Sequence, residues 1–286
     1  KEAFYEKVNV IPESKELYTE LQTYLDVENL STRAVLGIDI YRYSSYKHME
    51  QTLIPFLFKI LFQKAIKHSL EQNRFVFQKF TKEKFEKSFL STGDGGYLIL
   101  NTPLHVLLFA INFQLVVLAY HLFPKLRHII GEISLRYAIT YDALYYFDDN
   151  FYGRSIINNA RILEKDNLNR CLIDQPTYEW FMINTDGTEN LQIFTINEIA
   201  NILDFQEYDD QYIYKGRNAI FGNKQSRDVG IINSDILKIG TIQSKDSVLD
   251  VYNLHLQVSM NVSDDQNKQN KRTITISLGN LNTSGI

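Results

Sequence analysis

The sequence contains a single cysteine, Cys171, among 286 residues. It can therefore form no internal disulfide, and it offers no group of thiolates for a zinc or iron–sulfur site. The simplest location for such a chain is the cytoplasm, and we predict that location. The opening segment, residues 1–17, is charged and lacks a continuous apolar core, so it does not resemble a secretory signal.

The chain also lacks an excess of positive charge. It carries 30 lysine and arginine residues against 34 aspartate and glutamate residues, a formal net charge of −4. This balance provides no basic field for holding duplex nucleic acid, so we expect no nucleic-acid partner, although a local phosphate site is compatible with it. An anionic ligand must then be held by a few placed cations or by metal ions.

Long apolar runs are scarce, and one stretch, residues 104–123, is about as long as a bilayer span. It contains two histidines and two amide side chains, which would be costly in lipid. It also follows Pro103, and proline is favoured at the first position of a helix. We therefore predict a buried core helix and no membrane partner.

Hydrophobic residues make up 44% of the chain and charged residues 22%, which suits one or two globular domains with sizeable cores. Hydrophobic spacing and turn residues predict an order of elements over the first part of the chain. These elements are a strand (residues 34–41), a long helix (48–72), a hairpin (85–100), a helix (103–123), one or two strands (133–147) and a helix (154–167). The order favours an α/β or α+β sandwich with helices over one sheet.

The pattern changes after about Asp228. Three segments look like strands separated by polar turns, and the stretch before them has the glycine and polar content of a linker: residues 229–243, 248–262 and 272–281 for the strands, and 214–228 for the linker. We therefore predict two domains, residues 1–222 and a small β-rich domain at 223–286.

Two acidic residues stand out because of their surroundings. Asp94 lies in "GDGG", where aspartate and glycine suit the backbone angles of a hairpin turn. Asp39 lies within the apolar strand "AVLGIDIY", where an unpaired carboxylate is expensive to bury. If this strand lies beside the hairpin, the two carboxylates converge at one edge of the sheet. With a nearby backbone oxygen they would form a site of hard ligands for Mg²⁺ or Mn²⁺, which attracts phosphate.

A third segment, "YGRSIINNAR", opens the helix predicted after Gly153. Asn158 and Arg161 are three residues apart and therefore share a face of that helix. An arginine in this place would stabilise the charge that develops on a transferred phosphate. Taken alone, the segment fits a surface arginine beside helix-capping polar residues better.

These three segments, in this order, resemble the class III nucleotidyl cyclase catalytic domain. The family's D-I-x-x-[FY] is matched by "DIYRY", its G-D-G by residues 93–95, and its [FWY]-G-x-x-[VI]-N-x-A-x-R approximately by "YGRSIINNAR". GGDEF-type cyclases and polymerase palms share the paired aspartates, but the helix ending in Arg161 favours the class III family. The resemblance spans roughly residues 34–166. It implies an α+β fold with a ferredoxin-like, palm-type antiparallel sheet and covering helices, followed here by a small all-β domain.

The resemblance also implies an antiparallel homodimer with composite active sites. Asp39 and Asp94, aided by the carbonyl of Ile40, would bind two Mg²⁺ or Mn²⁺ ions. Arg161, supplied by the other chain of the dimer, would stabilise the transition state. The family's asparagine falls one position before Asn158, which we assign as the nearest candidate for a ribose or phosphate contact.

Base selection is where the sequence departs most from the family. Purine cyclases usually carry lysine or glutamate four residues before the second metal aspartate, and this chain has Leu90 there. Three residues before the glycine of the helix motif, Asn150 replaces the adenylate type's aspartate or the guanylate type's cysteine. An apolar residue paired with an amide suits a pyrimidine, because an amide offers both a donor and an acceptor.

Other residues are candidates for the nucleotide pocket. Tyr41, Arg42 and Tyr43 follow the first metal strand, although aromatic packing explains the tyrosines equally well. Gly93 would leave room for the triphosphate. Two basic residues at 215 and 217 would bind the β- and γ-phosphates or form a solvated turn.

Taken together, these features are similar to the pyrimidine cyclases of the bacterial Pycsar antiphage systems. The resemblance implies conversion of UTP to 3′,5′-cyclic UMP and pyrophosphate as an antiphage second messenger. The alternatives are a cytidylate cyclase that makes cyclic CMP and a catalytically silent, cyclase-like nucleotide sensor. The displaced Asn158 favours the sensor, and the two aspartates with Arg161 favour an enzyme.

Overall fold

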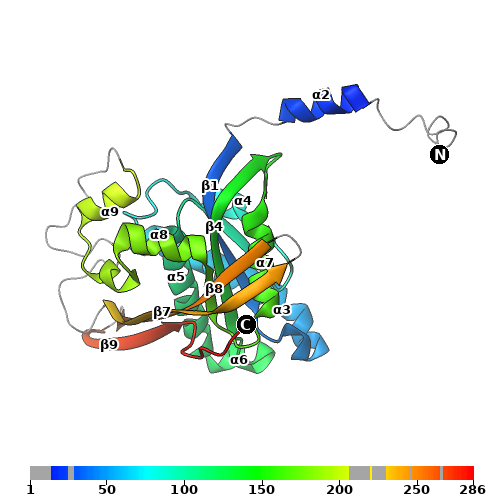
Figure 1. Ribbon diagram of the computed structural model, residues 1–286. Coiled ribbons are helices and arrows are strands. Elements are labelled where there is room, and N and C mark those ends of the chain that lie inside the picture. Colours follow the sequence, from blue (N-terminus) through cyan, green and yellow to red (C-terminus); the bar gives the residue numbers. More distant parts are fainter. Residues whose placement is uncertain (1–13, 25–28, 206–219, 221–229, 245–246, 265–266) are drawn as a thin grey trace.

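The computed structural model describes residues 14–24, 29–205, 220, 230–244, 247–264 and 267–286. These residues build one nine-stranded sheet with the strand order β2-β3-β1-β4-β6-β8-β7 (Figure 1), in which β5 also pairs with β4 and β9 with β8. All the pairs are antiparallel except the parallel pair of β4 and β6. The strands are β1 (Leu30–Ile40), β2 (Phe89–Ser91), β3 (Gly95–Leu100), β4 (Leu135–Phe147), β5 (Asn150–Tyr152), β6 (Cys171–Asp174), β7 (Gly230–Ser244), β8 (Ser247–Asp264) and β9 (Asn267–Leu278).

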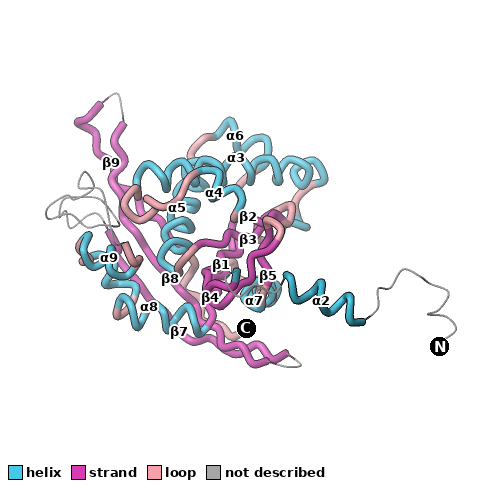
Figure 2. Tube along the Cα trace, turned by 90° about the horizontal axis from the view of Figure 1, so that it is seen from above, coloured by secondary structure: helices cyan, strands magenta, loops and turns pink. Residues whose placement is uncertain are grey.

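Helices cover both faces of this sheet. The helices are α2 (Ser14–Tyr24), α3 (His48–Gln72), α4 (Lys82–Lys87), α5 (Pro103–His121), α6 (Pro124–Ile130), α7 (Arg154–Lys165), α8 (Gln175–Thr185) and α9 (Ile196–Ile202), with short 3₁₀ turns at Tyr43–Ser45 and Thr188–Gln192. Of these, α2 extends away from the sheet (Figure 1). In Figure 2, α3, α5 and α6 lie on one side of the sheet and α7 on the other. The α+β class with an antiparallel sheet and covering helices is therefore confirmed.

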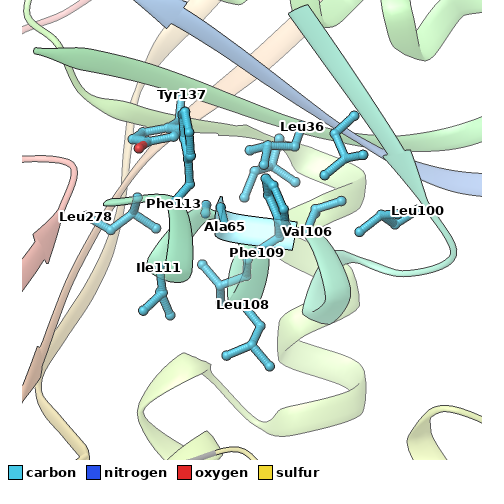
Figure 3. Close-up of a cluster of buried hydrophobic side chains, with 14 of the residues drawn as sticks. Leu36, Ala65, Leu100, Val106, Leu108, Phe109, Ile111, Phe113, Tyr137 and Leu278 are labelled. Carbon is cyan, nitrogen blue, oxygen red and sulfur yellow. The ribbon is translucent and has the colours of Figure 1, made fainter. Parts of the chain in front are cut away.

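Alternation along β1 explains the two faces. Successive side chains of a strand point to opposite faces of the sheet. Leu36 and Ile38 are buried in the main core on one face, and Val35 belongs to a smaller cluster on the opposite face, the α7 side. The main core is rich in phenylalanine from α3 and α5. Figure 3 shows Phe109 and Phe113 of α5 among the aliphatic side chains of this core.

The predicted core helix is confirmed as α5, which begins at Pro103 under a Thr102 cap. Among the described residues it is the one helix long and apolar enough to cross a bilayer, yet 72% of its most apolar stretch is buried inside the fold. Its polar residues are satisfied there, because Asn112 Nδ2 donates to Ser69 Oγ at 2.9 Å and to Asn73 Oδ1 at 2.8 Å.

The strands predicted after Asp228 are present as β7, β8 and β9. They continue the main sheet instead of forming a sheet of their own, because β6, an element that the sequence patterns did not predict, pairs with β8. Leu254 and Leu256 of β8 are buried in the main core. The predicted boundary at residues 222 and 223 lies outside the described residues, as does the predicted linker apart from Ile220.

Candidate active site

The register of the sheet brings the two predicted metal ligands together. Asp39, the last but one residue of β1, lies opposite Gly95 of β3 on one side and Arg136 of β4 on the other. Asp94 immediately precedes Gly95, so it reaches the same edge of the sheet as Asp39. Burial raises the pKa of the Asp94 carboxyl, and the nearby charge of Asp39 raises it further.

The glycines of "GDGG" have separate structural reasons. Gly93 has a φ of 106°, a conformation that disfavours any residue with a Cβ atom. A Cβ atom on Gly95 would lie 2.1 Å from the carbonyl oxygen of Ile38, so only glycine allows β3 to approach β1 here. A Cβ atom on Gly93 would meet nothing within 4 Å, so space remains open beside Asp94 on that side. The turn thus holds one carboxylate close to β1 and leaves room in front of it.

Arg136 is a site residue that the motifs did not indicate. Its Nε donates to Asp39 Oδ2 at 2.5 Å, and its Nη1 donates to the carbonyl oxygen of Asp166 at 2.5 Å. The Arg136 charge also lowers the pKa of Asp94, against the effects of burial and of Asp39. The guanidinium thus balances part of the negative charge at this edge. Only the pairing register of β1 and β4 places it there, and a single sequence does not fix that register.

The donor set at this edge fits a hard divalent cation. Asp39 and Asp94 supply carboxylates, and the carbonyl of Ile40 follows directly after Asp39. Within the described residues there is no cluster of three or more histidine, cysteine, aspartate or glutamate side chains. Mg²⁺ does not need one, because it commonly binds one or two carboxylates and completes its shell with water and substrate phosphates. These residues would therefore hold such ions together with a phosphorylated ligand.

The three residues after β1 have defined structural contacts. The Tyr41 hydroxyl donates to the carbonyl oxygen of Asn167 at 2.7 Å, and the Tyr43 hydroxyl donates to that of Gln51 at 2.7 Å. Arg42 has a φ of 57° and places its guanidinium carbon 5.0 Å from the centre of the Tyr41 ring. Their predicted role in binding the nucleotide stays a prediction.

Helix α7 carries the predicted pair Asn158 and Arg161, and Arg161 Nη1 donates to Asn158 Oδ1 at 3.4 Å. The helix is fixed to the sheet by Asn159, a residue that the motif comparison passed over. The fully buried Asn159 Nδ2 donates to the carbonyl oxygens of Val35 and Ala138, both at 2.9 Å. A Cβ atom on Gly37 would lie 1.9 Å from Asn159 Oδ1, so the glycine of "GIDI" makes this close packing possible.

The two predicted base-selecting residues lie in different places, Leu90 in the same hairpin as Asp94 and Asn150 far from both carboxylates of its own chain. Leu90, in β2, packs against the small cluster around Val35. Asn150 begins β5 opposite Phe147, at the far end of β4 from Arg136. That stretch of β4 spans roughly 35 Å at the usual rise per residue. One chain therefore brings Asp39 and Asp94 together but does not bring Asn150 to them.

The basic residues at 215 and 217 lie outside the described residues.

No protein-family model matches the sequence, and no curated protein matches it. Similar solved structures include an adenylate/guanylate cyclase/hydrolase from Silicibacter pomeroyi (12% identity, TM-score 0.41), covering 79% of this chain and 96% of that chain. Another is the adenylyl cyclase CyaB from P. aeruginosa, which is 10% identical with a TM-score of 0.45. The match covers 79% of this chain and 94% of that chain. A third is a guanylyl cyclase domain from the fungus Blastocladiella emersonii, which is 8% identical with a TM-score of 0.43. The match covers 78% of this chain and 96% of that chain.

Proposed function

We propose that this protein is a metal-dependent nucleotidyl cyclase of the class III type. The observation that supports the proposal most directly is the convergence of Asp39 and Asp94 at one edge of the sheet, with Arg136 bonded to Asp39. A helix carrying Asn158 and Arg161 packs closely on one face of the sheet, where Gly37 has no side chain and leaves room for Asn159. This is the set of groups that handling a triphosphate requires: carboxylates for cations, and arginines for phosphate charge.

In the proposed reaction the ribose 3′-oxygen attacks the α-phosphorus of its own nucleoside triphosphate. The new bond joins the 3′-oxygen to that phosphorus, the proton of the 3′-hydroxyl passes to water, and the bond from the phosphorus to the bridging oxygen breaks, releasing pyrophosphate. Asp39, Asp94 and the Ile40 carbonyl would hold Mg²⁺ or Mn²⁺, which supplies acidification of the attacking hydroxyl and charge neutralisation. Arg136 provides a fixed positive charge, and Arg161 would stabilise the charge developing on the phosphate.

The substrate we propose is UTP, giving 3′,5′-cyclic UMP as an antiphage signal in the cytoplasm. Leu90 supports a pyrimidine because it is an apolar, half-buried residue that offers a base neither charge nor hydrogen bond. The Asn150 amide can serve either edge of a pyrimidine, so CTP is the alternative substrate.

Two chains would build each active site. The separation of Asn150 from Asp39 along the sheet supports this arrangement, because base selection and metal binding then come from different chains. An antiparallel homodimer would contain two such composite sites. A silent nucleotide sensor is the second candidate function, and it is favoured by the one-residue displacement of Asn158.

The proposal is tested by incubating the protein with each of the four ribonucleoside triphosphates and Mn²⁺ or Mg²⁺, then identifying products by mass. We expect cyclic UMP and pyrophosphate in equal amounts. Asp39→Asn and Asp94→Asn should each abolish turnover, because each removes a cation ligand. Asp235→Asn, at an exposed position on β7, is the matched control and should keep full activity.

Cyclic product from the double variant Asp39→Asn/Asp94→Asn would contradict the metal site. Tight binding of a nucleotide with no product from any of the four substrates would favour the sensor. Cyclic CMP as the main product would support the proposed cyclisation but contradict UTP as the substrate.

A further inference from the structure

A cavity of about 500 Å³ opens at the other end of β1 from the carboxylate pair. Arg33 lines it, and the stretch of β1 from Arg33 to Asp39 spans roughly 20 Å at the usual rise per residue. The start of β1, the end of β3, the α4 region and the paired residues Tyr146 of β4 and Phe151 of β5 form its walls. We call this cavity the basic pocket after four cationic residues in its lining: Arg33, Lys79, Lys84 and Lys87.

No aspartate or glutamate of the described chain lines the basic pocket. The lysine contacts do little to compensate the charge, because Lys79 Nζ donates to the carbonyl oxygen of Asp204 at 3.1 Å and Lys84 Nζ donates to that of Lys79 at 3.0 Å. These acceptors are neutral. Lys87 has the Asp149 carboxylate at 3.7 Å, but both side chains are at least 70% exposed, and such pairs are weak.

Arg33 is the least solvated of the four cations. Its guanidinium is half-buried, and this burial lowers its pKa. Arg33 Nε donates to Ser31 Oγ at 3.0 Å, and Nη1 donates to Asn101 Oδ1. Within the described part of the chain, no carboxylate forms an ion pair with it. Desolvating a charge is costly unless an opposite charge is near, so an anionic ligand would offset a cost that the free protein bears.

The expected counter-ion of Arg33 is engaged elsewhere. In the register of β1 and β4, Arg33 lies opposite Asp142. The Asp142 Oδ2 atom instead accepts hydrogen bonds from Arg154 Nε at 3.1 Å and from Arg154 Nη2 at 2.9 Å. The strand pairing therefore leaves the positive charge of Arg33 facing the cavity without its cross-strand partner.

Aromatic side chains complete the lining. The rings of Tyr146 and Phe151 lie 4.8 Å apart between centroids, and Phe80 joins them in the wall of the cavity. Aromatic faces stack on nucleobases, and clustered lysine and arginine side chains bind phosphate. A cavity of this volume is also within the range of small-molecule sites.

We propose that the basic pocket binds a nucleoside di- or triphosphate, with the phosphates against Arg33 and the lysines and the base against Tyr146 and Phe151. Within one chain this site is separate from the carboxylate pair, and it needs no divalent cation, because the chain itself supplies the positive charge. It goes beyond the proposed cyclase activity, and it stands whether or not the protein cyclises nucleotides.

The test is calorimetric titration of the full chain with UDP and with ADP in the presence of EDTA, which removes the divalent cations that the carboxylate pair would use. We expect saturable binding of at least one of them. Lys84→Gln/Lys87→Gln should weaken it at least tenfold, since two phosphate contacts are lost. These lysines are exposed, so the variant should fold, which a thermal melt verifies. Arg33→Gln should weaken binding further.

The matched control is Lys64→Gln/Lys67→Gln, which removes the same charge from two exposed positions on α3. It should bind the nucleotide as the unmodified protein does, and so should Asp39→Asn/Asp94→Asn. The inference is overturned by absence of saturable binding, or by equal affinity in Lys84→Gln/Lys87→Gln. It is also overturned if a short single-stranded oligonucleotide binds the pocket more tightly than either nucleotide. Because no product is measured, failure here is distinct from failure of the cyclase assay.

Discussion

Arg136 controls the charge around the candidate cation ligands. It is bonded to Asp39, and it holds down the pKa of Asp94 while burial and Asp39 raise it. Removing the guanidinium should therefore raise the pKa of Asp94, so that this carboxyl stays protonated, and unable to bind a cation, up to a higher pH. The acidic limb of the pH–rate profile of Arg136→Gln should therefore move to higher pH. Arg136→Lys should restore most of the shift, and an unmoved limb in Arg136→Gln would contradict this role.

Asp174 makes stability depend on pH. It caps α8, accepting from the Thr177 amide at 3.0 Å and the Tyr141 amide at 3.3 Å, and burial raises its pKa to about 7 from an ordinary value of 3.8. Between these values the folded state holds a proton that the unfolded chain releases. The contribution of this group to the free energy of unfolding should therefore fall as pH rises from about 4 to 7.

Denaturant unfolding at pH 5 and pH 8 measures this effect. Asp174→Asn keeps an acceptor for Thr177 but leaves the Tyr141 amide unpaired, so the variant should be less stable at low pH. Because it has no proton to release, its free energy of unfolding should change less between the two pH values than that of the unmodified protein. Equal changes in the two proteins would rule out Asp174 as the titrating group.

At the scale of elements, the hairpin and the long helices were predictable because each has a local signal. "DG" between apolar arms specifies a turn, and Pro103 marks the start of α5. β6 is a run of four buried residues, "CLID". Such a run is too short to show the hydrophobic periodicity of either a helix or a strand. α8, which follows it, did carry a signal that we did not use: Asp174 at the cap and proline in its first turn.

The segment after α7 connects the end of the chain to the candidate site. Arg170 Nε donates to Asp166 Oδ1 at 2.8 Å, and its Nη1 donates to the carbonyl oxygen of Ser284 at 2.6 Å. The carbonyl of Asp166 in turn accepts from Arg136, which holds Asp39. This sequence of contacts joins the residues after β9 to the carboxylate pair.

Breaking the buried ion pair between Arg170 and Asp166 should strongly destabilise the fold. Arg170 and Asp166 are each 1% exposed, so Arg170→Met leaves a buried carboxylate unpaired and should lower the free energy of unfolding by about 3–5 kcal/mol. Arg154→Met breaks the exposed pair with Asp142 and serves as the control, with an expected loss within about 1 kcal/mol. Urea unfolding of both variants gives the comparison. Similar losses would show that the buried pair has no special weight.

At the scale of the whole molecule, the sequence indicated candidate residues for the chemistry but not how they are distributed in space. Asp39 and Asp94 were recognisable because an acid in an apolar strand and an acid between glycines are both unusual. Arg136, Asn159 and the basic pocket depend on strand register and on helix packing, which join residues far apart in the chain. The opposite positions of Asn150 and Asp39 likewise became visible only in the assembled sheet.

This distribution leads to a test of the composite sites in the proposed dimer. If Asp39 of one chain works with Arg161 of the other, a heterodimer of Asp39→Asn with Arg161→Ala contains one intact site and one doubly altered site. It should show about half of the unmodified activity, although each parental homodimer is inactive. Purification through two different tags and a turnover assay with UTP and Mn²⁺ give the measurement.

The matched control is a heterodimer of the unmodified chain with a chain carrying both Asp39→Asn and Arg161→Ala. Like the first heterodimer, it contains one unmodified and one substituted residue at position 39, and the same at position 161. If the sites are shared between chains, each site of this control has lost one essential group and the dimer should be inactive. If each chain holds a complete site, the outcomes reverse: the control keeps half of the activity, and the first heterodimer has none.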